Sequence, residues 1–156
     1  MAELIDILGY ICENYPYKDE LSNARLTKMV YLSDWKSAIE QGRQISDIKW
    51  IFNHHGPYVD DVYQEAHRSH LFKIIREVNV YGNEKFVFNL SSTKDWISLT
   101  EQDIICINHV IKETKPMLWR DFIHLVYSTY PVVVSDKYSR LNLVELARRY
   151  KRALHS

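Results

Sequence analysis

The residues whose types could support chemistry begin with the histidines, four of which fall close together in the chain. His54 and His55 are adjacent, and His67 and His70 are three residues apart, a spacing that places two side chains on one side of a helix. A zinc site needs further ligands at set spacings, and neither cysteine lies nearby. We therefore expect no metal, with His67 and His70 at a solvated helix end and His54 or His55 hydrogen-bonded beside a turn.

Signatures of catalysis are missing from the sequence. There is no GxSxG, HExxH, P-loop or GxGxxG pattern, and four glycines are too few for a phosphate-cradling loop. The carboxylate pair Asp60 and Asp61 is predicted to lie in a first helical turn, where acidic side chains favour the helix macrodipole. We expect neither enzymatic activity nor a cofactor.

One strongly basic run lies near the end of the chain, at Arg148, Arg149, Lys151 and Arg152. On a terminal helix these side chains could hold phosphates or an acidic protein surface, or they could form a solvated face. The formal net charge of the chain is zero, with 20 basic and 20 acidic residues. This balance removes any general attraction to nucleic acid, so we expect weak or no DNA binding. It also permits a homo-oligomer.

Aromatic residues are abundant, with 11 tyrosines and four tryptophans. Two interpretations remain open. Tyrosine and tryptophan provide large contact areas in protein interfaces. Alternatively, Trp35, Trp50 and Trp119 belong to the core, with most tyrosines half-buried at its rim.

The size and composition predict one globular domain over residues 1–156. The sequence is 46% hydrophobic and 26% charged, which excludes disordered and fibrous classes. Cys12 and Cys106 sit in apolar helical stretches and are expected to be free, buried thiols. The first residues lack a signal-peptide pattern and no run is long enough to span a bilayer, so we expect a cytoplasmic protein without a membrane partner.

Hydrophobic periodicity and capping signals predict an α+β fold, dominated by about six helices, with a small antiparallel sheet of two or three strands. Ser22 is a predicted N-cap and Gly42 a predicted helix end. Thr100-Glu101-Gln102-Asp103 resembles a capping box with Asp in the position usual for Glu, and predicts a helix start there. Pro57 is expected in a first helical turn and Pro131 at a helix end. The predicted helices cover residues 2–15, 23–41, 57–70, 101–114, 117–130 and 143–154, and the predicted strands cover 48–53, 72–81 and 85–90.

Two segments carry a more specific signal. The first runs from Arg25 to Trp35 and is followed by Gly42-Arg43-Gln44-Ile45-Ser46; the second is Trp50 to Val59, with Val62-Tyr63 after it. Together they resemble the Panacea domain, the SocA-like antitoxin family, over about residues 4–90. The resemblance singles out these motif positions: Lys28, Tyr31, Asp34, Gly42, Arg43, His55, Gly56 and Pro57. Gln44 departs from the pattern, since the family usually has proline there, which loosens a turn.

The resemblance implies an antitoxin that neutralises a cognate protein toxin by direct binding; one family member instead delivers its toxin to a protease, and some lie in phage-related gene neighbourhoods. We interpret the motif as mainly structural, because Gly56 and Pro57 make a rigid junction. Partner contacts are then expected on less patterned residues: Tyr58, Asp61, Tyr63, Arg148, Arg149 and Arg152. Two alternatives remain: a winged-helix-like nucleic-acid-binding regulator, and a metal-dependent hydrolase that rests only on the histidines.

Overall fold

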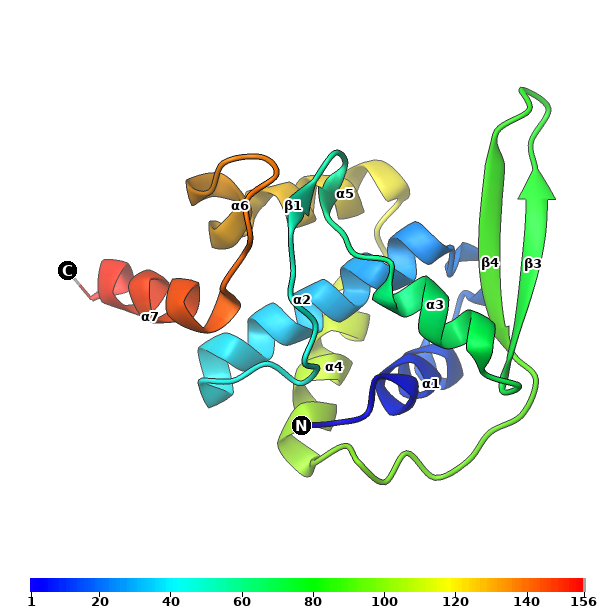
Figure 1. Cartoon of the computed structure of the whole chain (residues 1–156), viewed down its shortest axis with the longest axis horizontal. Helices are drawn as coiled ribbons and strands as arrows, with labels where there is room; N and C mark the ends of the chain where they lie inside the picture. The colour runs from blue at the N-terminus through cyan, green and yellow to red at the C-terminus, as the bar shows by residue number, and fades with distance from the viewer. Residues whose placement is uncertain (156) are drawn as a thin grey trace.

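The computed structural model describes residues 1–155, which form an α+β arrangement of seven α-helices, one 3-10 turn (η1) and two separate antiparallel strand pairs (Figure 1). The helix-dominated α+β prediction is confirmed, with one helix more than expected. In chain order the elements are α1 (Leu4–Asn14), η1 (Lys18–Glu20), α2 (Asn23–Gln41), β1 (Phe52–Asn53), β2 (Gly56–Pro57), α3 (Asp61–Arg68), β3 (Phe72–Val78), β4 (Glu84–Leu90), α4 (Glu101–Thr114), α5 (Trp119–Ser128), α6 (Tyr130–Val134) and α7 (Leu143–Leu154).

Helix α2 is the central element, and α1, α3, α4 and α7 pack around it (Figure 1). Its bounds follow from its ends. The Ser22 hydroxyl accepts a hydrogen bond from the Arg25 amide at 3.1 Å, and Gly42 adopts the left-handed conformation at φ 73°. Both predicted ends are confirmed. Most residues of α2 are buried, and they lie on all sides of the helix. The helices that pack around α2 are therefore positioned by their contacts with it.

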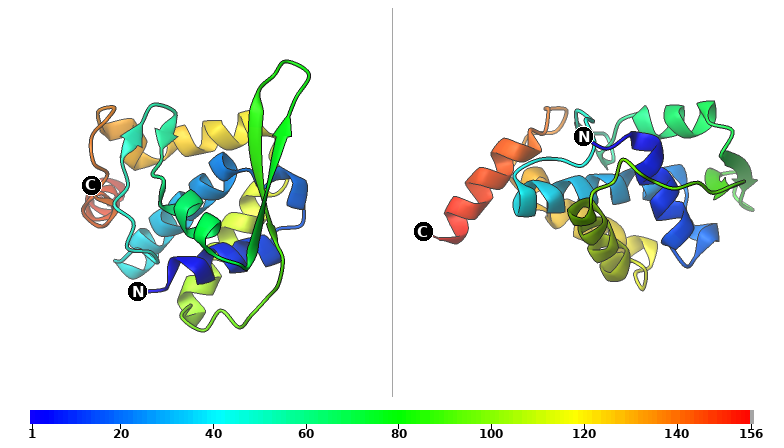
Figure 2. Two further views of the ribbon diagram at one scale, coloured as in Figure 1. Left: turned by 45° about the vertical axis from the view of Figure 1, so that its right-hand side comes forward. Right: turned by 90° about the horizontal axis from the view of Figure 1, so that it is seen from below.

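The hairpin of β3 and β4 is the largest strand pair, with Phe72 opposite Leu90 and Val78 opposite Glu84. Near its base, Phe88 is buried against the helices. Its far end projects beyond the helical body, as Figure 1 and the left view of Figure 2 show. At the tip, Val80 and Tyr81 are 94% and 86% exposed. The hairpin therefore stands partly free of the core.

The predicted strand over residues 48–53 is mostly wrong, because only Phe52 and Asn53 pair as a strand, opposite Pro57 and Gly56. The preceding residues belong to no strand, and Ile51 forms only an isolated antiparallel bridge with Arg140. The backbone partners of this segment come from the C-terminal region: Leu141 N–H donates to Trp50 C=O at 2.8 Å, and Phe52 N–H donates to Ser139 C=O at 2.9 Å.

Two proline predictions also need correction. Pro57 does not open a helix, because it pairs in β2 and α3 begins only at Asp61. Pro131 does not end a helix; α5 stops at Ser128, and Pro131 lies in the first turn of the additional helix α6. An early helical position suits proline, since its missing N–H would have no partner there.

The core confirms part of the tryptophan interpretation. Trp50 is fully buried and Trp35 is 8% exposed, whereas Trp119 is 47% exposed and does not belong to the core. Cys12 and Cys106 are free and buried, as predicted. Within residues 1–155, none of the helices combines the length and the apolar character that crossing a bilayer requires.

Candidate functional site

Asp34 lies at the centre of the predicted motif and is completely buried on α2. Its Oδ1 accepts hydrogen bonds from the backbone N–H groups of Ile45 and Ser46, at 3.0 and 2.9 Å. Its Oδ2 accepts from the Ser46 hydroxyl at 2.5 Å and from Trp50 Nε1 at 2.9 Å. One carboxylate therefore holds the chain that leads from α2 to β1.

The electrostatics of Asp34 reflect this position. Burial raises the pKa of the carboxyl to about 6, while the hydrogen bonds from Ser46, Trp50 and Ile45 act in the opposite direction. Gln44 adds a further link, because its Nε2 donates to Ile48 C=O at 2.9 Å and to Ser46 C=O at 3.2 Å. The amide that replaces the family's proline thus ties the turn together by hydrogen bonds.

Tyr31 and Lys28 extend the motif one and two turns back along α2. The Tyr31 hydroxyl lies 2.8 Å from Thr129 Oγ1, and its ring meets Trp50 edge-on with the centroids 5.5 Å apart. Lys28 is 2% exposed, and its Nζ lies 5.9 Å from the centroid of the Tyr58 ring. Burial lowers the pKa of this amine to about 8. Among residues 1–155, no carboxylate forms an ion pair with it.

Arg43 connects the turn after α2 to α4. Its guanidinium lies 3.0 Å from Asp103 Oδ1, and Asp103 completes a capping box with Thr100 at the start of α4, as the sequence predicts. Burial alone would raise the pKa of Asp103, but hydrogen bonds from Gln41 and Thr100, with the nearby Arg43 charge, outweigh it and lower the pKa. Gly42 and Arg43 are thus parts of the framework.

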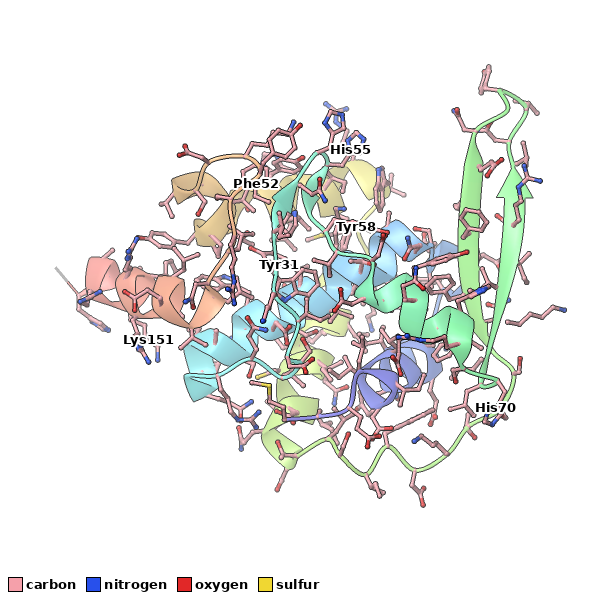
Figure 3. All side chains as sticks on the ribbon, viewed as in Figure 1. Tyr31, Phe52, His55, Tyr58, His70 and Lys151 are labelled. Carbon is pink, nitrogen blue, oxygen red and sulfur yellow. The ribbon has the colours of Figure 1, made fainter. Side chains whose placement is uncertain are left out.

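His54 and His55 form the turn of the small β1–β2 hairpin, and Gly56 and Pro57 follow the turn as strand β2. Gly56 adopts φ +98°, and a Cβ at this position would lie 3.4 Å from the ring of Tyr127. His55 is exposed at the tip of the hairpin (Figure 3). Its neighbour His54 places Nδ1 3.2 Å from the Tyr138 hydroxyl, which agrees with the predicted hydrogen bond beside a turn.

The other histidines lie elsewhere. His67 is exposed and stacks on Tyr63, and His70 is exposed after the end of α3, as predicted for a solvated helix end. No group of three His, Cys, Asp or Glu side chains within residues 1–155 is placed to hold a metal ion.

Three of the predicted partner contacts gather near α3, but two of them have internal roles. Tyr58 accepts from Asn23 Nδ2 at 2.9 Å and donates to Asp60 Oδ1 at 3.0 Å. Tyr63 is half-buried against the sheet, with its ring centroid 6.0 Å from that of Phe86. Asp61, the first residue of α3, is exposed.

The other three predicted contacts lie on α7 at the left end of the molecule in Figure 1, whereas α3 lies right of centre, between α2 and the β3–β4 hairpin. Arg148, Arg149 and Arg152 expose 68%, 57% and 73% of their side chains, and all three lie within 3.9 Å of the same acid, Glu145. The six predicted contact residues are therefore not brought together in one site.

Sequence reasoning missed a groove beside the projecting hairpin, with a volume of about 510 Å³. It is lined by Phe86 of β4, by Arg25 at the start of α2, and by Leu118 and Trp119 at the start of α5. Trp119 shares a helical side with Phe122 and Val126, so periodicity predicts it as core. It is nevertheless 47% exposed, because it is the first residue of α5 and lines the open groove.

The comparisons with known proteins agree with the motif geometry. The family described as "Antitoxin SocA-like, Panacea domain" matches residues 26–131, a range that begins later and ends later than the resemblance seen in the sequence. No curated protein and no solved structure matches the chain. The match covers more than half of the 156 residues and includes every motif position from Lys28 to Pro57, so the chain belongs to the SocA-like antitoxin, Panacea domain family.

Proposed function

We propose that this protein is the antitoxin of a toxin–antitoxin system and that it neutralises a cognate protein toxin by direct binding. The observation that carries the proposal is the family match over residues 26–131. The chemistry of the motif supports it, because Asp34, Tyr31 and Arg43 are engaged in contacts within the fold. Such a framework suits a protein that presents a surface.

The exposed residues are the natural contact positions in this proposal. Asp61, Arg148, Arg149 and Arg152 are accessible, and a protein partner is favoured over DNA because the formal net charge is zero. Tyr58 and Tyr63 would contribute through their exposed edges. We propose no catalytic role for any of these side chains.

We also infer that the functional domain extends beyond the matched range. Helix α1 packs on α2 and α3, and α7 packs on α2 through Leu143, Leu146 and Ala147. Both terminal helices therefore contribute to the same core, which supports one domain over residues 1–156.

Co-expression tests the proposed function. The gene adjacent to the one for this chain is expressed alone and together with it, and growth is measured. Neutralisation predicts that the neighbour's product is toxic alone and harmless with the antitoxin, and that the two proteins co-purify. A neighbour that is toxic in both conditions, or harmless in both, contradicts the proposal.

The same experiment separates neutralisation by contact from delivery to a protease. Direct binding predicts that the toxin accumulates at full length in a complex. An adaptor predicts that the toxin disappears unless the protease is inactivated. Light scattering on the purified antitoxin then establishes whether it is an oligomer.

A further inference from the structure

The groove beside the hairpin has an open strand edge along one side. Phe88 N–H points away from β3, because it donates to Leu21 C=O at 2.9 Å. Strand residues alternate in the direction of their backbone groups, so Phe86 and Glu84 direct their N–H groups to this same outer side. Neither N–H forms a hydrogen bond on that side with any residue of the described range 1–155. The outer half of β4 thus offers unpaired donors to the groove.

The floor of the groove contains a buried cation without a carboxylate partner. Arg25 is 3% exposed, and it donates through one terminal nitrogen to Thr114 C=O and Met117 C=O, at 3.0 and 3.1 Å. Its Nε has no hydrogen-bond acceptor within residues 1–155, and no acid in that range forms an ion pair with it. A buried N–H of a charged group that lacks an acceptor destabilises the fold, so an oxygen atom of a ligand that accepted from Arg25 Nε would bind favourably.

The opposite wall is apolar and accessible. Leu118 is 73% and Trp119 47% exposed, and both line the groove together with Phe86. The Trp119 ring packs on Phe122 at 5.8 Å between centroids, and Phe122 in turn contacts the Arg25 guanidinium at 4.5 Å. This fixed tryptophan is well placed to receive an apolar side chain, in the manner of an interface anchor.

We propose that this groove binds an extended segment of a partner protein, which adds to the free edge of β4 and directs a carboxylate or carbonyl oxygen toward Arg25. Addition of a strand uses main-chain hydrogen bonds for affinity and adjacent side-chain contacts for selectivity. The backbone supplies unpaired donors, and Leu118 and Trp119 supply apolar contact. The Arg25 guanidinium supplies a positive charge that forms no ion pair within residues 1–155, although Glu20 and Glu84 also line the groove. The groove volume of about 510 Å³ falls within the range of ligand-binding clefts.

The identity of the partner, the toxin, rests on the proposed function. The mode of binding in the groove does not depend on it. The test therefore begins with a probe that needs no toxin: a displayed library of random linear peptides, selected on the full chain. The groove predicts enriched peptides that bind in an extended form with an acidic residue and an apolar residue.

Two pairs of variants locate the binding site. Glu84→Pro removes an N–H from the edge of β4 that faces the groove. Val78→Pro is its control, because Val78 lies opposite Glu84 on β3, at the other edge of the same hairpin. Trp119→Ala removes the apolar wall, whereas Ile97→Ala truncates an exposed residue, 86% accessible, that does not line the groove. We expect Glu84→Pro and Trp119→Ala to weaken peptide binding at least about tenfold, and the two controls to leave it within about twofold.

The outcomes are distinct. Failure to enrich any peptide, or enriched peptides that bind all four variants equally, overturns the groove proposal. The same variants are then tested against the adjacent gene's product. If the wild-type chain binds that toxin and the four variants bind it equally well, the proposed function stands and the groove is not its toxin site. If the wild-type chain binds peptides in the groove but not the neighbour's product, the proposed function fails and the groove remains.

Discussion

The turn after α2 and the C-terminal helix α7 both contain residues that the sequence analysis singles out, the first as motif positions and the second as partner contacts, and the two regions are built in opposite ways. In the turn, one buried acid, Asp34, receives hydrogen bonds from Ile45, Ser46 and Trp50. On α7, one half-exposed acid, Glu145, faces three exposed arginines. The turn after α2, which carries the family motif, satisfies its polar groups by internal hydrogen bonds. Helix α7, which lies outside the motif, leaves its arginines exposed. In this protein the family motif therefore marks residues that hold the fold together.

The largest effect is expected from Asp34→Ala. The change leaves the amides of Ile45 and Ser46 and the indole N–H of Trp50 without acceptors in a buried site. We expect the free energy of unfolding to fall by about 3–5 kcal/mol, measured by urea denaturation. The control Asp61→Ala removes an exposed acid from the start of α3 and should cost about 0.5 kcal/mol. Equal losses at the two positions would contradict the contrast between the two regions.

Lys28→Met should stabilise the protein at neutral pH. The amine is 2% exposed, and its pKa of about 8, against 10.5 for an ordinary lysine, corresponds to a cost of about 3 kcal/mol for holding the charge in the fold. Methionine keeps the length of the side chain without the charge. We expect a gain of about 1–3 kcal/mol in urea denaturation at pH 7.

The pH dependence of this gain sharpens the test. The unfolded chain keeps the Lys28 proton between pH 8 and pH 10.5, where the folded chain has lost it, so the wild type gains stability across this interval relative to the variant. The advantage of Lys28→Met should therefore shrink as the pH rises from 8 to about 10. Lys36→Met, which removes an accessible amine beside Glu40, should change stability by about 0.5 kcal/mol or less at pH 7. A constant advantage across the pH range would show that the amine is not responsible.

Gly56→Val is expected to act on stability and not on binding. The residue adopts φ +98°, which strains a side chain there, and a Cβ would already lie 3.4 Å from the Tyr127 ring. We expect a loss of about 1–3 kcal/mol in thermal unfolding, with partner affinity unchanged once the folded fraction is taken into account. Gly82→Val, at φ +81° with open space around it, separates backbone strain from the ring contact. If the Gly56→Val variant kept its full stability but lost partner binding, the β1–β2 hairpin itself would be a contact site.

The sequence predictions were right where a feature depends on residues close together in the chain, and wrong where it depends on residues far apart. The ends of α2 and the capping box at Thr100 depend on neighbours three or four residues away, and both were predictable. The segment before Phe52 was not, because the backbone it bonds to lies at residues 138–141. The groove was missed for the same reason, since β4, the start of α2 and the start of α5 meet only in the folded chain.

The smallest effect on stability is expected from the triple change of Arg148, Arg149 and Arg152 to Ala. These arginines are exposed and share Glu145, and exposed ion pairs contribute little, so the free energy of unfolding should change by about 1 kcal/mol or less. The informative measurement is DNA binding over a salt series. If the three side chains held phosphates, the logarithm of affinity would fall with that of salt at a slope of about −0.9 for each phosphate, so roughly −3.

Glu145→Gln provides the complementary variant, because it removes the acid that pairs with all three arginines and leaves their charges in place. A phosphate clamp predicts that Glu145→Gln strengthens DNA binding and that the triple alanine variant abolishes it. An antitoxin with a protein partner predicts weak DNA binding for all three proteins, while the arginine changes lower the affinity for the toxin. Sub-micromolar DNA binding at physiological salt that disappears in the triple variant would favour the nucleic-acid-binding regulator, because a chain with zero net charge has no other general attraction to DNA.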